Sequence, residues 1–164
     1  MRNLILALLM TLSIQVVLAT EQTPDLLVIG KDTICLKSFP LEELNFEQHP
    51  FKYGNADFPN TGCWRGYQAL WEVKNDTLFL VAIRKADATR EKVDLKTYFE
   101  KNGYEPIMVD GKVFANWYSA TFEKYNSFGF FNPCIVERDE PKSKRNIKLS
   151  IVNGLLIFTK WGNR

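Results

Sequence analysis

The sequence predicts a mainly β protein, in which an antiparallel meander of about eight strands carries one short helix packed on it. Three observations predict this fold. Turn pairs typical of β-hairpins recur along the chain, apolar residues alternate beside them, and only one segment has clear helical spacing. A curved sheet, a barrel and a sandwich all satisfy this pattern, and the choice among them stays open.

The centre of the predicted sheet is a hairpin within residues 62–83, where Asn75 and Asp76 separate two apolar runs. A two-residue loop would place Trp71 opposite Leu80, within an almost entirely apolar face that must be buried. The other face carries Phe79 and is also too apolar to be freely solvated. The same register pairs further residues as follows: Val73 with Leu78, Ala69 with Ala82, Tyr67 with Arg84, Glu72 with Phe79, Leu70 with Val81, and Gln68 with Ile83. We therefore expect cover on both faces and a central place in the sheet.

Three more hairpins are predicted from the same turn chemistry. Residues 26–29 and 33–37 flank a short loop at residues 30–32. The pair Asp110–Gly111 separates residues 106–109 from residues 112–122, and the pair Asn153–Gly154 separates residues 146–152 from residues 155–161. Asp-Gly and Asn-Gly favour the primed turns that match strand twist. The last strand is expected to tie the C-terminal residues into the sheet.

The predicted helix starts after Asp94, a residue suited to capping a helix N-terminus. Leu95, Tyr98 and Phe99 follow at helical spacing, and the segment stops at Gly103. So short an apolar stripe cannot stabilise a helix alone, so we expect it to lie on the sheet, as a candidate cover for the second face of the central hairpin.

Between the first two hairpins the pattern is less regular. Ser38 is expected to cap a short helical turn that carries Leu41 and Leu44. Residues 45–62 then hold two prolines, two glycines and several aromatic residues without a period, which predicts a long ordered loop.

Residues 1–19 have the layout of a secretory signal peptide. Arg2 precedes an apolar run at residues 4–12, and Val17 and Ala19 occupy the −3 and −1 positions of a cleavage site. Polar residues interrupt the run, which disfavours a membrane span. We expect residues 20–164 to form a single domain, secreted or periplasmic, without integral membrane insertion after cleavage. An uncleaved anchor or a buried N-terminal strand is the alternative.

The charge balance disfavours nucleic acid as a partner. The formal net charge is +2, and the segment expected to be removed contains one of the basic residues, Arg2. Neither nucleic acid nor anionic lipid therefore has a basic surface to bind. The basic cluster at residues 142–145 follows the mixed-charge residues 137–140 and is interpreted as a solvated loop.

The chain has three cysteines, Cys35, Cys63 and Cys134, far apart in sequence. In an oxidising compartment one disulfide is expected, and all three pairings remain open. The remaining thiol could fill a buried apolar space, link to a partner chain or react.

Catalytic and metal-binding patterns are sparse. The single histidine, His49, lacks a G-x-S-x-G turn to present a serine nucleophile, and a dyad with Cys63 is the less favoured interpretation of that cysteine. The cysteines and the histidine lack zinc-ligand spacing, and no phosphate-binding glycine loop occurs. Four carboxylates are candidates for glycoside hydrolysis, and none stands out: Glu72, Glu105, Glu123 and Asp110. We predict no catalytic residue, metal or cofactor, and the question of enzymatic activity stays open, leaning against it.

Aromatic residues are abundant, with eight of them in residues 114–131. A glycine-interrupted aromatic loop at residues 125–131 is hard to bury completely, and exposed aromatic side chains bind sugars and proteins. The alternative for each of these aromatic residues is a buried place in the hydrophobic core. The predicted binding residues are Tyr125, Phe128, Phe130 and Phe131 in this loop, Phe51 and Tyr53 in the earlier loop, and Arg65.

The central hairpin also carries a resemblance. The run C-W-R-G-Y-x-A-x-W-E-V at residues 63–73, followed by N-D-x-L-x-L at residues 75–80, resembles a pattern in small exported bacterial proteins of unassigned function. Residues 113–119 and 38–42 are similar to segments of the same proteins. The resemblance implies an envelope or secreted setting and supplies no catalytic or binding residues. Arg65, within the run, is expected to be either a surface charge or the partner of a buried carboxylate such as Glu72 or Glu123.

These observations favour an exported, non-enzymatic binding or interaction domain, with an inhibitor or immunity-type protein as one form. A protein partner and a carbohydrate are both possible ligands. The alternatives are a carboxylate-dependent hydrolase of the envelope and a structural accessory subunit of an envelope assembly.

Overall fold

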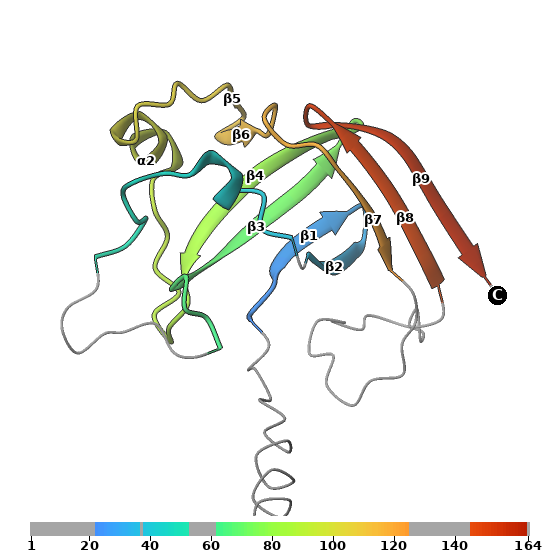
Figure 1. The fold of residues 1–164 in the computed structure, drawn as a ribbon, viewed down its shortest axis with the longest axis horizontal. Coiled ribbons are helices and arrows are strands. Elements are labelled where there is room, and N and C mark those ends of the chain that lie inside the picture. The colour runs from blue at the N-terminus through green and yellow to red at the C-terminus, as the bar shows by residue number, and fades with distance from the viewer. Residues whose placement is uncertain (1–21, 37, 53–61, 125–144, 164) are drawn as a thin grey trace, which may run out of the picture.

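The computed structural model describes residues 22–36, 38–52, 62–124 and 145–163 (Figure 1). Within them nine strands form one curled, mixed sheet with the shape of a half-barrel. One 3-10 turn, η1, and one α-helix, α2, accompany the sheet. In chain order the elements are β1 Asp25–Ile29, β2 Asp32–Leu36, η1 Glu42–Leu44, β3 Tyr67–Lys74, β4 Thr77–Lys85, α2 Leu95–Lys101, β5 Met108–Val109, β6 Lys112–Phe114, β7 Ala120–Lys124, β8 Arg145–Val152 and β9 Leu155–Asn163.

The predicted central hairpin is confirmed as β3 and β4. Trp71 pairs with Leu80, and both side chains are fully buried in the core. Asn75 and Asp76 form the turn with positive φ angles of 50° and 55°. The hairpin lies between β1 and β9 in the strand order, which is the central position that the sequence predicted.

The predicted register is wrong beyond Trp71. A β-bulge places Leu70 opposite Ala82 while Trp71 stays opposite Leu80, so every pair further from the turn shifts by one residue. The shift continues along the hairpin: Ala69 pairs with Ile83, Gln68 with Arg84, and Tyr67 with Lys85. The extra residue turns Ile83 toward the core, where it is fully buried.

The sheet is not a pure antiparallel meander. β1 pairs with β2 antiparallel, as predicted, but it pairs with β3 in parallel. The strand order is β2-β1-β3-β4-β9-β8-β7, and the short β5–β6 hairpin branches from β4. β4 and β9 share a single register pair, Thr77 with Leu155, so the sheet bends sharply there and β7, β8 and β9 form a second wall (Figure 1).

One core fills the space inside the bend. It joins Leu27 and Trp71 of the first wall to Leu149 and Ile151 of the second. The side chain of Tyr118 is fully buried in the same cluster. Both walls therefore contribute to one core.

The helix α2 forms as predicted, and the carboxylate of its N-cap, Asp94, accepts a hydrogen bond from the backbone of Thr97 at 2.8 Å. Its position differs from the expectation. Phe99 contacts Trp117 at a centroid distance of 5.7 Å, and Trp117 contacts Trp71 at 6.4 Å. The helix therefore covers the Trp71 face of the hairpin, inside the bend, and not the second face.

Two local predictions are also corrected. The expected strand at residues 112–122 breaks after β6, and residues 115–119 cross to the second wall before β7 begins. Ser38 caps no helix: η1 begins after Leu41, and the hydroxyl of Ser38 instead accepts a hydrogen bond from Tyr118 at 2.9 Å. Tertiary contacts, which short sequence patterns do not contain, decide both cases.

The structure shows the bonding state of two of the three cysteines. Cys63 is a buried free thiol, and its Sγ lies 3.2 Å from the backbone oxygen of Tyr67. Cys35 is disulfide-bonded, but no complete disulfide pair lies within the described residues. Cys134 lies outside them.

Candidate functional site

The β5–β6 hairpin pairs with β4 through β6, and some of its side chains reach the outer face of the first wall, the face away from the core. Lys112 of β6 forms an ion pair with Glu72 of β3, and Asp110 lies 3.8 Å from the Nζ of Lys74. Because β4 lies between these strands, both ion pairs cross over it. Glu72, one of the candidate catalytic carboxylates, is therefore paired with a lysine.

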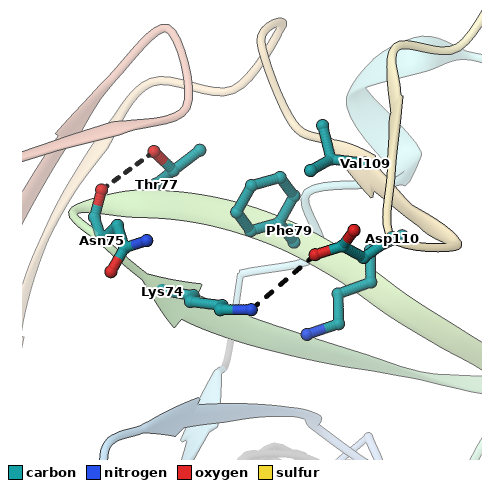
Figure 2. Close-up of a pocket in the computed structure, with 7 residues that line it drawn as sticks. Lys74, Asn75, Thr77, Phe79, Val109 and Asp110 are labelled. Carbon is teal, nitrogen blue, oxygen red and sulfur yellow. Dashed lines mark hydrogen bonds and ion pairs between the residues drawn. The ribbon is translucent and has the colours of Figure 1, made fainter.

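A hollow of about 170 Å³ lies between the two hairpins on this outer face (Figure 2). Phe79 forms its floor. Lys74, Asn75 and Thr77 line it on the side of the β3–β4 turn, and Val109, Asp110 and Lys112 line it on the side of the β5–β6 turn. The hydroxyl of Thr77 donates to the backbone oxygen of Asn75 at 3.1 Å, which fixes the turn side.

An exposed strip of aliphatic side chains borders the hollow. We name it the outer strip, and it consists of Ile107, Val109, Val152, Leu155 and Ile157. Val109 lines the hollow with Thr77, Thr77 pairs with Leu155, and Leu155 pairs with Val152, so the aliphatic side chains of the β5–β6 hairpin and those of the β8–β9 hairpin lie on two sides of the hollow.

The outer strip holds most of the large exposed apolar side chains in the described part of the chain. Leu155 is 50% exposed and Ile157 is 65% exposed. The sixth large exposed side chain of this kind is Trp64, which precedes β3 at the end of that strand opposite the hollow. Single exposed apolar residues need no explanation, but a group of them marks an interaction surface.

A second polar cluster lies inside the protein, around Asp25 and Arg65. The two side chains form an ion pair at 3.2 Å, and the residues are 0% and 4% exposed. Asp25 also accepts hydrogen bonds from the backbone of Ala69 and the indole of Trp71, each at 3.1 Å. Burial raises the pKa of Asp25, while the charge of Arg65 and these hydrogen bonds oppose the rise.

The rest of Arg65 is equally enclosed. Its Nη2 donates to the backbone oxygen of Thr23 at 2.8 Å, and its guanidinium lies 3.7 Å from the ring centroid of Phe39. These contacts hold residues 22–25 against the start of β3. A cluster that solvent does not reach cannot contact a ligand, so its role is structural.

The predicted binding residues fall into two groups. Phe51 is buried in the core, and Arg65 is paired with Asp25, which was not among the carboxylates expected for it. The other five lie outside the described residues: Tyr53, Tyr125, Phe128, Phe130 and Phe131. Of the two that are described, neither Phe51 nor Arg65 lines the hollow or belongs to the outer strip.

The outer strip was missed although the sequence contains a signal for it. Ile151 and Leu156 of the last hairpin belong to the core face, and their chain neighbours Val152, Leu155 and Ile157 are apolar as well. A hairpin that is apolar on both faces needs a second cover. Only the three-dimensional structure shows that none of the described residues covers this face of the β8–β9 hairpin.

Two further findings concern the described residues alone. They contain no group of three or more His, Cys, Asp or Glu side chains placed to hold a metal ion. None of their helices combines the length and the apolar character needed to cross a bilayer.

In comparison with known proteins, the chain matches no family model, no curated protein and no solved structure.

Proposed function

We propose that the protein is an exported, non-enzymatic binding domain that holds a protein partner against the outer strip. The observation that carries this proposal is the group of exposed aliphatic side chains that two hairpins, β5–β6 and β8–β9, place around a hollow with a charged rim. An apolar centre with a polar rim is typical of protein–protein interfaces.

The aliphatic character of the strip favours a protein over a carbohydrate. Sugar rings are usually bound on exposed aromatic faces. Among the described residues, the hollow is lined by one aromatic side chain, Phe79, and the outer strip beside it contains none. Leu, Ile and Val side chains instead match the apolar centre of a partner protein's surface.

Export through the segment at residues 1–19 is part of the proposal, as is a place outside the cytoplasm. An inhibitor or immunity-type protein is one form of such a domain. The carboxylate-dependent hydrolase has less support, because Glu72 is paired with Lys112 and Asp110 lies beside Lys74.

The test is a quantitative affinity enrichment of the tagged full-length protein from its own host. The double variant Leu155→Lys/Ile157→Lys places two charges in the strip, and Trp64→Ser is the matched control because it removes an equally exposed apolar side chain elsewhere. We expect the wild type and the control to recover the same partner, and the double variant to recover at least about tenfold less. Equal recovery by the folded double variant would refute the proposal.

The same experiment separates a free ligand binder from a structural subunit of an envelope assembly. A subunit is recovered with several companions in fixed stoichiometry. A binder of the proposed kind is recovered with one dominant partner.

A further inference from the structure

The size of the hollow restricts what it can hold. Pockets for drug-sized ligands and cofactors measure about 300–1,000 Å³. A cavity of about 150 Å³ holds one benzene ring. At about 170 Å³, the hollow beside Phe79 therefore fits one ring-sized group and not a whole ligand of that class.

The lining of the hollow restricts the chemistry of that group. Phe79 and Val109 supply an apolar floor and wall, and Phe79 is held by Phe114 at a ring-centroid distance of 6.2 Å. Lys74 and Asp110 supply a hydrogen-bond donor and an acceptor at the rim (Figure 2). The hollow therefore favours an apolar ring that ends in a group able to both donate and accept.

The charges at the rim favour a neutral group. Each lysine of the lining has a carboxylate beside it, since Lys74 lies 3.8 Å from Asp110 and Lys112 pairs with Glu72. A charged ligand would meet no net countercharge. The Lys74–Asp110 pair is exposed, and such pairs contribute little to stability, so an entering hydroxyl displaces it at small cost.

We propose that the hollow is a socket for a tyrosine side chain of the protein partner. The ring lies on Phe79 and against Val109, and its hydroxyl donates to Asp110 and accepts from Lys74. The inference rests on the proposed function, because the outer strip borders the hollow through Thr77 and Leu155. Tyrosine is among the residues that most often anchor protein interfaces, and it fills such sockets at low entropic cost.

The test is a titration of the full chain with N-acetyl-L-tyrosinamide, followed by amide NMR shifts. We expect saturable shifts confined to residues 74–79 and 109–112, with N-acetyl-L-phenylalaninamide binding at least about fivefold more weakly because it lacks the hydroxyl. Asp110→Asn should keep the turn, because Asn-Gly suits this turn as well as Asp-Gly does. We expect this variant to bind N-acetyl-L-tyrosinamide less than about twofold more tightly than N-acetyl-L-phenylalaninamide.

Three results would overturn the socket: no saturable shift, shifts centred elsewhere, or equal binding of the two amides. Its failure can be told apart from failure of the proposed function. If the probe does not bind but Leu155→Lys/Ile157→Lys still loses the partner, the outer strip remains the binding surface and only the tyrosine socket is rejected.

Discussion

Asp25 and Arg65, forty residues apart in sequence, form an ion pair from which solvent is excluded. The pair joins the first residues of β1 to the segment that leads into β3. Ala69 and Trp71 complete the hydrogen bonds of the carboxylate. This arrangement fixes the parallel register of β1 on β3, which is the one parallel contact among the described strands.

Removing one partner of this pair should be costly. We expect Arg65→Met to lower the free energy of unfolding by about 3–5 kcal/mol, because it leaves the Asp25 carboxylate buried without a countercharge. Arg65→Met/Asp25→Asn should be more stable than Arg65→Met alone, since it removes that charge as well. Urea unfolding of the two single variants and the double variant measures the coupling, and strictly additive losses would show that the two side chains act independently.

Gly154 should tolerate no side chain. A Cβ at this position would lie 2.6 Å from the backbone oxygen of Ala115, whereas a Cβ at Gly111 would meet nothing within 4 Å. The φ angles are nearly equal, 74° and 75°, so the two positions share the same backbone strain. We expect Gly111→Ala to cost about 1–2 kcal/mol from that strain.

Gly154→Ala should cost about 1–3 kcal/mol more than Gly111→Ala, because the added methyl group also overpacks against Phe114 and the backbone of Ala115. Thermal and urea unfolding of both variants give the difference. Equal losses of unfolding free energy in the two variants would mean that the structure around Gly154 is packed more loosely than its contacts indicate.

Buried tyrosines should make the protein sensitive to alkali. Burial raises the pKa of Tyr118 to about 12, although its hydrogen bond to Ser38 lowers it. Because the folded pKa lies above the unfolded value of about 10, the neutral phenol contributes stability that is complete below pH 10 and is lost as the pH rises toward 12. Burial also raises the pKa of Tyr67 and Tyr98.

Unfolding free energies measured between pH 8 and 12 test whether the titration of Tyr118 is coupled to unfolding. Tyr118→Phe should reduce the slope of the decline above pH 10, and it should cost about 1 kcal/mol at pH 8 through the lost hydrogen bond. A variant whose stability falls in parallel with that of the wild type would show that Tyr118 does not titrate with unfolding.

The disulfide is predicted to join Cys35 to Cys134. Cys35 is disulfide-bonded and Cys63 is a buried free thiol, which leaves one of the three pairings that the sequence allowed. Peptide mapping without reduction should recover the residue 35 and residue 134 peptides together, with Cys63 alkylated only after denaturation. A linked peptide that contains Cys63 would contradict this assignment.

Local signals predicted the elements of the fold well. Paired turn residues located the hairpins at Asn75, Asp110 and Asn153, and the Asp94 cap located α2. These signals succeed because turn geometry and helix capping depend on neighbouring residues. The bulge opposite Leu70 and the parallel pairing of β1 could not be predicted, because each depends on contacts between segments far apart in sequence.

The candidate site was harder to predict than the fold. Arg65 pairs with a carboxylate, which is one of the two roles that the sequence left open for it, but its partner Asp25 reaches it only through the parallel strand pairing. The hollow forms where the β5–β6 hairpin pairs with β4, and the hydrophobic period of the sequence does not predict this contact between segments. The abundance of aromatic residues pointed to the loops, whereas the large exposed apolar side chains among the described residues are mainly aliphatic.

The central claim is that the outer strip binds a partner protein, and site-specific photo-crosslinking in the host tests it most directly. The photoreactive residue replaces Ile157 in one protein and Lys96 of α2, which is similarly exposed, in another. The account predicts one recurrent adduct from position 157 that position 96 does not give and that Leu155→Lys abolishes. No adduct from position 157, or the same adduct from both positions, would contradict it.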